Sequence, residues 1–102
     1  MIKIRHKVYE STLHRLSIKG HADYGPHGGD IVCAGVSALT YALLGSVEEL
    51  GGKIVYCRAD SGDVKLVCYG ADDAFAMALT GFRQIEEKYP QNVEVIDAAR
   101  GG

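Results

Sequence analysis

The sequence predicts an α+β fold: a two-layer sandwich in which two helices pack on one face of a mostly antiparallel sheet. Three observations lead to this prediction. Strand-like segments come in two pairs, and each pair is joined by a short turn signal. A segment with helical spacing of its apolar residues follows each pair. A short β-rich segment comes last, so the expected order of elements is ββαββαβ.

The first pair of strands covers residues 2–9 and 12–19. In the first strand, apolar residues and His6 alternate with basic residues, which is typical of a half-buried strand. We therefore expect His6 to be a buried histidine with hydrogen-bond partners, and His14 is ambiguous in the same way. The outward residues form one basic sheet face, for which a solvated surface is the simplest explanation and an acidic or peptide partner the alternative. These residues are Lys3, Arg5, Lys7, Arg15, Ser17 and Lys19.

A glycine-rich loop at residues 20–29 interrupts this periodicity, and a helix over 31–50 follows it. The helix is predicted from apolar residues at three- and four-residue spacing, which are Val32, Val36, Leu39, Leu43, Val47 and Leu50. Its other sides are apolar as well. We therefore expect it to be buried on more than one face, in the core or against a second subunit. Gly51 and Gly52 end it.

The second pair of strands covers residues 54–59 and 64–69 and flanks a turn signal with Gly62 at its centre. If Gly62 and Asp63 were the two turn residues, Cys57 would lie opposite Cys68. A disulfide at that position is disfavoured in a reducing cytosol.

The second helix begins near Asp72 and Asp73 and ends at Pro90. One face of it is apolar and is expected to pack on the sheet; it consists of Phe75, Leu79, Phe82, Ile85 and Tyr89. Residues 93–96 are predicted to form a last short strand, and residues 98–102 a loose tail.

Composition narrows the possible functions. The chain has 102 residues, 47% of them hydrophobic and 24% charged, so we expect one globular domain over residues 1–102. Its 11 Lys and Arg against 13 Asp and Glu give a formal net charge of −2. This total gives no overall attraction to nucleic acid or to an anionic membrane, and we expect neither as a direct partner.

The compartment is predicted from what the sequence lacks. No signal peptide is recognisable at its start, and no apolar run is long enough to span a bilayer. Three cysteines are an odd set, which favours reduced thiols. We therefore expect a cytoplasmic protein.

Potential proton carriers and ligands gather in the glycine-rich loop and the helix start that follows, and they are His21, Asp23, His27, Asp30 and Cys33. With Asp30 as the N-cap, Cys33 lies in the first helical turn, where backbone N–H groups and the helix dipole stabilise a thiolate. His21 could act as its base, and the same N–H groups could form an oxyanion hole. Because a carboxylate near the thiol opposes the thiolate, Asp30 must turn toward the backbone or toward His21.

Other interpretations of these residues remain open. Cys33 could be a small buried residue of a core helix. His21, Asp23, His27, Asp30 and Cys33 could instead bind one Zn²⁺, although their spacing matches no common zinc signature. We expect Ser37 to bond back to a helix carbonyl, with a role at the site as the alternative. Tyr24 could present an aromatic surface to a substrate.

Two sequence elements resemble a known family. Gly20-His21-Ala22 and the segment from Gly28 to Ser37, which reads GGDIVCAGVS, are similar to the signature of the bacterial ribosomal-processing cysteine proteases, the Prp family. The length and the order ββαββαβ agree as well, so the resemblance covers nearly the whole chain.

This resemblance implies a function and assigns roles. The family removes the N-terminal extension of a large-subunit ribosomal protein, the homologue of bacterial L27, by cutting after an aromatic residue. It implies Cys33 as nucleophile, His21 as base, Asp30 as a capping or orienting residue and Ser37 as a supporting one. It also implies a homodimer and no metal or other cofactor. The substrate loop would comprise Ala22, Asp23, Tyr24, Gly25, His27, Gly28 and Gly29.

His27 has no counterpart in the family pattern and ranks behind His21 as the base. Two functions of other classes remain alternatives. One is a non-catalytic ribosome-associated binding module that docks through the loop. The other is a metal-binding regulator that uses the His, Asp and Cys side chains of the same loop.

Overall fold

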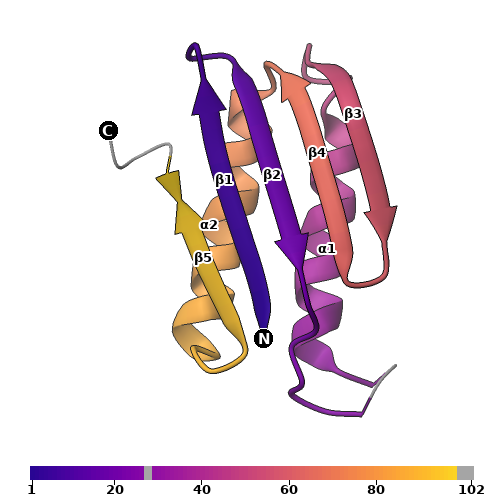
Figure 1. The fold of residues 1–102 in the computed structure, drawn as a ribbon, viewed down its shortest axis with the longest axis vertical. Coiled ribbons are helices and arrows are strands. Elements are labelled where there is room, and N and C mark those ends of the chain that lie inside the picture. Colours follow the sequence, from indigo (N-terminus) through magenta and orange to yellow (C-terminus); the bar gives the residue numbers. More distant parts are fainter. Residues whose placement is uncertain (27–28, 99–102) are drawn as a thin grey trace.

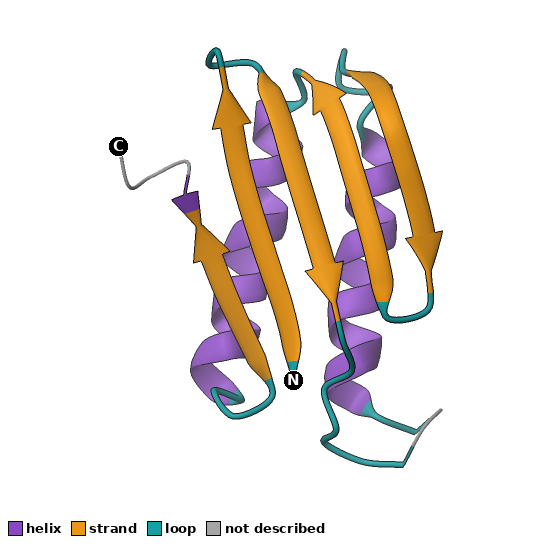
Figure 2. Cartoon of the chain, in the orientation of Figure 1, coloured by secondary structure: helices purple, strands orange, loops and turns teal. Residues whose placement is uncertain are grey.

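The computed structural model describes residues 1–26 and 29–98. Two helices cover one face of a five-stranded sheet, and the other face is left open (Figures 1 and 2). The elements are β1 (Ile2–Tyr9), β2 (Leu13–Lys19), α1 (Ile31–Ser46), β3 (Lys53–Asp60), β4 (Asp63–Tyr69), α2 (Asp72–Lys88) and β5 (Val93–Asp97). The predicted order ββαββαβ and the α+β sandwich are confirmed.

The strands lie side by side in the order β3-β4-β2-β1-β5. All neighbours are antiparallel except β1 and β5, which are parallel and place the last strand beside the first. Alternation in β1 and β2 is as predicted, since every second residue from Ile2 to His6 and from His14 to Ile18 faces the helices and is buried. The core therefore lies between the sheet and the two helices, with Ile4, Leu16, Leu66 and Phe82 fully enclosed.

The two helices differ in how far they match the prediction. The face of α2 that was expected to pack on the sheet does so, with Phe75 and Phe82 almost completely buried. In contrast, α1 ends at Ser46 and not at Leu50, which is 53% exposed. The chain continues from Val47 in short turns, in which the N–H of Gly52 donates to the Val47 carbonyl at 2.8 Å. Val47 and Leu50 continue the apolar spacing of the helix through these turns. The prediction therefore extended the helix too far.

The hairpin between β3 and β4 also differs from the prediction. Its two turn residues are Ser61 and Gly62, since Asp60 pairs with Asp63. With this turn, Cys57 lies opposite Leu66 and not opposite Cys68, and a bulge at Val55 shifts the register only beyond Tyr56, where Ile54 pairs with Cys68. The Cys57–Cys68 pairing that a Gly62-Asp63 turn would give therefore does not occur.

A buried polar chain connects the strands β1, β2 and β5 with α2. Nδ1 of His6 lies 2.9 Å from an oxygen of Asp97, and its Nε2 lies 2.9 Å from Nδ1 of His14. His14 in turn contacts Asp72, and its ring stacks on Phe75 at a centroid distance of 4.0 Å. His6 is thus a buried histidine with partners on both nitrogens, as expected, and His14 is of the same kind.

Neither helix, in the ranges the structure describes, has the length and apolar character needed to cross a lipid bilayer.

Candidate active site

Asp30 organises the start of α1. It is the N-cap of this helix, and its Oδ1 accepts hydrogen bonds from the N–H groups of Val32 (2.9 Å) and Cys33 (3.0 Å). Its Oδ2 accepts from the N–H groups of Tyr24 (2.9 Å) and Gly25 (3.2 Å), which lie in the preceding loop. One carboxylate therefore caps the helix and fixes the loop. It is turned toward the backbone, as the sequence requires of a carboxylate so near a thiol.

These four donors explain the ionisation of Asp30. Burial of the carboxyl group raises its pKa, but the hydrogen bonds from Cys33, Tyr24, Gly25 and Val32 favour the charged form and outweigh burial. The net result is a pKa below the ordinary value of 3.8. Asp30 is therefore a fixed anion near neutral pH, which suits a structural role better than proton transfer.

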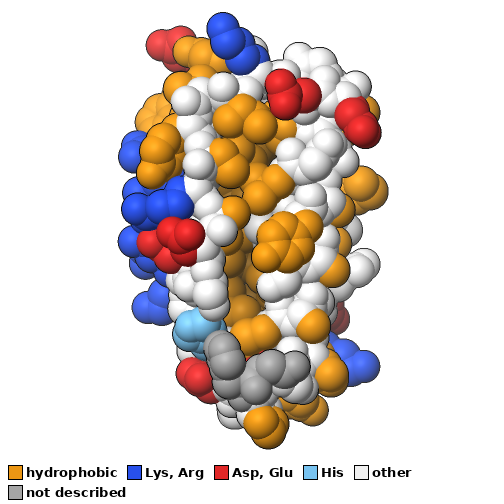
Figure 3. All heavy atoms as spheres, turned by 90° about the vertical axis from the view of Figure 1, so that its right-hand side faces the viewer, with side chains coloured by type: hydrophobic (Ala, Val, Ile, Leu, Met, Phe, Trp, Pro, Cys, Tyr) orange, Lys and Arg blue, Asp and Glu red, His pale blue; other side chains and the backbone are white. Residues whose placement is uncertain are grey.

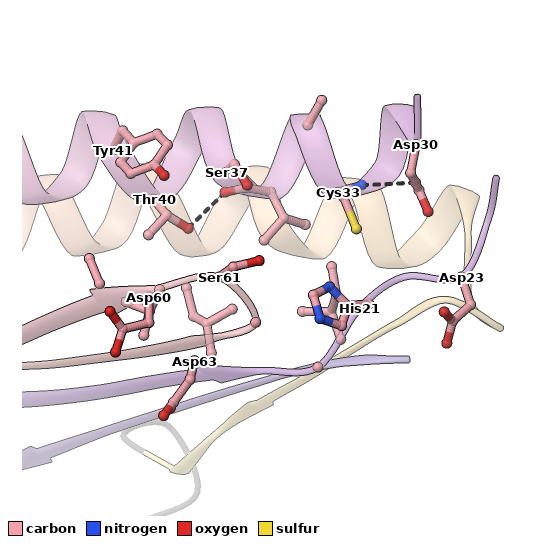
Figure 4. A pocket seen from close by; sticks show the side chains of 18 of the residues that line it. His21, Asp23, Asp30, Cys33, Ser37, Thr40, Tyr41, Asp60, Ser61 and Asp63 are labelled. Carbon is pink, nitrogen blue, oxygen red and sulfur yellow. Dashed lines mark hydrogen bonds between the residues drawn. The ribbon is translucent and has the colours of Figure 1, made fainter. Parts of the chain in front are cut away.

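Cys33 and His21 face one another across a pocket. Figure 4 shows the sulfur of Cys33 pointing down from α1 toward the imidazole of His21, which belongs to the segment that follows β2. The backbone N–H of Ala22 donates to Cys33 Sγ at 3.3 Å. A thiol, an imidazole toward which it points and an N–H group that donates to its sulfur are therefore brought together, and this is the combination that thiol-dependent acyl transfer uses.

Gly62 belongs to this site, although nothing in the sequence pointed to it. A Cβ atom added at Gly62 would lie 2.7 Å from Nε2 and 2.9 Å from Cε1 of His21, so the imidazole rests directly on the backbone of the β3–β4 turn. The carbonyl of Gly62 also accepts from the N–H of Gly20 at 2.9 Å. The only signal for this position was a glycine in a turn, which has an ordinary explanation in its φ of +72°.

The pocket extends well beyond Cys33 and His21. It has a volume of about 510 Å³ and runs between α1 and the β3–β4 turn, toward Ser37 and Tyr41. Ile18, Val36 and Val64 supply apolar parts of its wall. A cavity of this size and lining can hold a large apolar side chain beside the sulfur.

Contacts from distant parts of the chain hold the loop between β2 and α1. Asn92, just before β5, donates from Nδ2 to the carbonyl of Ala22 at 2.8 Å. The ring of Tyr24 packs edge-on against Tyr89 at a centroid distance of 5.1 Å, although half of Tyr24 stays exposed. Asp23 and Gly25 line the pocket. Of the other loop residues singled out in the sequence, His27 and Gly28 lie outside the described residues.

Two sequence expectations about the helix start are wrong. The N–H groups of Val32 and Cys33 are bound by Asp30 and are not open to an oxyanion. Ser37 lines the pocket, but its hydroxyl forms no hydrogen bond within the described part of the chain. The hydroxyl that bonds back to a helix carbonyl is that of Thr40, which donates to Val36 at 2.7 Å.

The arrangement gives the zinc hypothesis no support. Both oxygens of Asp30 are occupied by backbone donors. Over residues 1–26 and 29–98, no three His, Cys, Asp or Glu side chains come close enough to share a metal ion.

The sequence matches one family of known proteins. A family model described as cysteine protease Prp matches residues 1–94. The ribosomal processing cysteine protease Prp of Staphylococcus aureus, in two strains, is 30% identical over 83 residues, which cover 74% of this chain and 78% of that protein.

Solved structures agree with these sequence matches. The essential ribosomal processing protease Prp of S. aureus, with a covalently linked product peptide, superposes with a TM-score of 0.85 at 25% identity, covering 95% of this chain and 99% of that one. The same protease with a substrate peptide gives a TM-score of 0.74. A protein of Streptococcus mutans, SMU.848, gives 0.73 at 25% identity and covers 95% and 93% of the two chains.

Proposed function

The chain belongs to the cysteine protease Prp family, and from this we propose that it removes the N-terminal extension of a large-subunit ribosomal protein, the homologue of bacterial L27, by a cut after an aromatic residue. The observation that carries the proposal is the meeting of Cys33, His21 and the N–H of Ala22 at the end of a long pocket. The chain is a cysteine protease; the substrate and the roles of its residues are the subject of the proposal.

In the proposed reaction, Cys33 is the nucleophile and His21 the general base and acid. Proton transfer from Cys33 to His21 leaves a thiolate, to which the N–H of Ala22 donates. Sulfur attacks the scissile carbonyl carbon, and the tetrahedral intermediate collapses as the C–N bond breaks. His21 gives its proton to the departing amine, which leaves an acyl group on sulfur as a thioester.

Water completes the turnover. His21 takes a proton from a water molecule, whose oxygen attacks the thioester carbon. The carboxylate product leaves, and sulfur takes back a proton from His21. Since Asp30 occupies the N–H groups of Val32 and Cys33, we assign stabilisation of the oxyanion to the N–H of Ala22, which donates to Cys33 Sγ.

The shape of the pocket supports a cut after an aromatic residue. The apolar wall made by Ile18, Val36 and Val64 belongs to the same pocket as Cys33 and suits a flat apolar ring. The proposed substrate loop runs from Ala22 to Gly29, and its residues Asp23 and Gly25 line the same pocket. Within it, Tyr24 offers an exposed ring to the peptide.

We further propose that the enzyme works as a homodimer in the cytoplasm. Figure 3 shows hydrophobic side chains gathered down the middle of the face that β3 and α1 share. Ile31 and Tyr41 on α1 and Val55 on β3 are each more than half exposed in the single chain. A second copy covering this face would remove them from water. The reduced state that the three free thiols need fits a cytoplasmic location.

The decisive experiment uses the extended precursor of the ribosomal protein from the same source. It is incubated with wild-type protein or with Cys33→Ala, and the products are weighed by mass spectrometry. We expect a single cut after an aromatic residue with the wild type and none with the variant, whose fold is checked by circular dichroism. A folded Cys33→Ala that still cuts would overturn the assignment of the nucleophile. A wild type that leaves an intact, extended precursor uncut would overturn the substrate.

A further inference from the structure

The open face of the sheet carries most of the chain's basic residues. Residues that point away from the helices can be identified from the register, because they pair across the strands in continuous rows. One row runs Lys7, Arg15, Val67, Tyr56, and the next runs Arg5, Ser17, Lys65, Arg58. Lys3, Lys19 and Lys53 lie on the same face. In Figure 3 the Lys and Arg side chains gather along the sheet side of the molecule.

The net charge of −2 gives no sign that the basic residues gather on one face of the sheet. The acidic residues of the face lie toward one end of the sheet, where Asp63 pairs with Lys19 and Asp60, and Glu94 pairs with Lys3. Of the basic residues on this face, Arg58 alone forms an ion pair within the described part of the chain, to Asp63 at 2.7 Å. The cations in the middle of the face are therefore not neutralised by neighbours.

This face is also hollowed. A depression of about 390 Å³ lies over the middle strands, and its lining includes Arg5, Lys7, Arg15, Lys19 and Lys65. Residues two apart on one strand lie about 7 Å from each other and neighbouring strands about 5 Å apart, so these side chains form a closely spaced set of donors. Such a depression suits several anionic groups at once better than it suits a single counterion.

Aromatic rings lie among these cations. Tyr56 and Tyr69 belong to the open face by their register and are 46% and 44% exposed. The ammonium of Lys7 lies 5.0 Å from the centre of the Tyr9 ring. A basic surface with exposed rings is the combination that single-stranded nucleic acid uses, because phosphates bind the cations and unpaired bases stack on the rings.

We infer that the open face of the sheet binds single-stranded nucleic acid, which in the proposed cytoplasmic location is RNA. Five of the cations are lysines, and lysine is depleted in protein–protein interfaces, which argues against a protein partner. The depression has few apolar side chains that could insert into lipid, which argues against a membrane. The inference goes beyond the cleavage reaction, since the face lies on the side of the sheet away from α1 and Cys33.

The test measures fluorescence polarisation of a short labelled single-stranded RNA with the purified protein. If about five phosphates are neutralised, the affinity falls with salt at a logarithmic slope of about −3.5, which is roughly 100-fold between about 50 and 200 mM. Arg15→Glu should weaken binding about five- to tenfold and reduce the slope by about 1. Lys88→Glu, on the exposed end of α2, changes the net charge equally and should leave binding unchanged.

Three results would overturn the inference: no RNA binding at low salt, equal weakening by Arg15→Glu and Lys88→Glu, or tighter binding of polyglutamate or of anionic vesicles than of RNA. The cleavage proposal is tested apart from this. Arg15→Glu should cut a short extension peptide at the wild-type rate, and Cys33→Ala should bind RNA as the wild type does.

Discussion

The imidazole of His21 rests on a position that has no side chain of its own. Gly62 contributes no reactive group, yet a Cβ atom there would overlap the ring of His21. The position of the ring therefore depends on a residue without a side chain, in a turn 41 positions further along the sequence. At the scale of single residues, the geometry of the candidate dyad depends on this glycine as much as on the two reactive side chains.

Gly62→Ala is therefore expected to impair cleavage through His21. A displacement of a catalytic group by about 1 Å can cost roughly 100-fold in rate, and we expect a loss of kcat of that order with little change in KM. The measurement is steady-state cleavage of a short peptide that spans the cut.

Gly51→Ala is the matched control. Gly51 also has a positive φ, of +82°, but no atom lies within 4 Å of an added Cβ. Both variants carry a similar backbone strain, of roughly 1 kcal/mol, so their stabilities should fall alike. Equal kcat values for the two variants would show that contact with His21 does not matter.

At the scale of elements, Asp30 unites the loop and α1. Its two oxygens serve different segments, one the helix and one the loop. The carboxylate is ionised in the folded protein at a pH where an unfolded Asp would be protonated. Its contribution to stability is present above the ordinary pKa of 3.8 and is lost as the pH falls through the lower folded value.

Serine and alanine at position 30 separate these two tasks. Asp30→Ser keeps a good N-cap but has one oxygen, so thermal stability should stay near that of the wild type while the loop loses the acceptor for Tyr24 and Gly25. We expect kcat/KM for the peptide to fall about tenfold or more. Asp30→Ala should lose both stability and activity. Wild-type kcat/KM in the serine variant would contradict a role of Asp30 in holding the loop.

The buried histidines connect strands with α2, and one of them, His6, makes stability depend on pH. Burial lowers the pKa of His6 below its usual 6.5; Asp97 opposes this, and His14 and Arg83 add to it. Between the folded and unfolded pKa values, His6 is therefore protonated in the unfolded chain and neutral in the folded chain. This part of the stability is present above pH 6.5 and is lost as the pH falls through the lower folded pKa.

Urea unfolding on either side of pH 6.5 tests this prediction. The free energy of unfolding of the wild type should decrease on acidification, and in His6→Gln most of that decrease should vanish, although the variant is less stable throughout. Wild-type stability that rises below pH 6.5 would mean that His6 is charged in the folded state.

At the scale of the whole molecule, the face shared by β3 and α1 is apolar and the open face of the sheet is basic. We expect each face to bind a different partner. The apolar side bears on the proposed homodimer. Tyr41 is 67% exposed there, so Tyr41→Glu should place a charge in the contact and yield monomers. Analytical ultracentrifugation of the variant and the wild type decides the matter; a wild type that is monomeric at all concentrations would refute the dimer.

Much of this architecture could be predicted from the sequence because it is local. Alternation in β1 and apolar spacing in α2 are properties of neighbouring residues, and each was read correctly. The capping geometry of Asp30 is also local, since all four of its donors lie within six residues.

What could not be predicted depends on contacts between distant segments. The register of the β3–β4 hairpin follows from a turn at Ser61 and Gly62, one residue earlier than a turn at Gly62 and Asp63, and no residue type distinguishes the two turns. The contact of Gly62 with His21 and the bond from Asn92 to Ala22 join parts of the chain that only the fold brings together. The basic face of β1 and β2 was predicted from their alternation, but its extension to Lys65 and Arg58 depends on the pairing of β4 with β2 and β3.

The bond from Asn92 to Ala22 has a consequence for the moment at which the enzyme becomes active. During synthesis the segment with His21 and Cys33 leaves the ribosome long before β5 does, yet Asn92 and the pairing of β5 with β1 come last. A nascent chain that ends before Asn92 lacks the amide that holds the loop beside the sulfur. The protease should therefore stay inert on its own translating ribosome and gain activity only when its C-terminal strand has emerged.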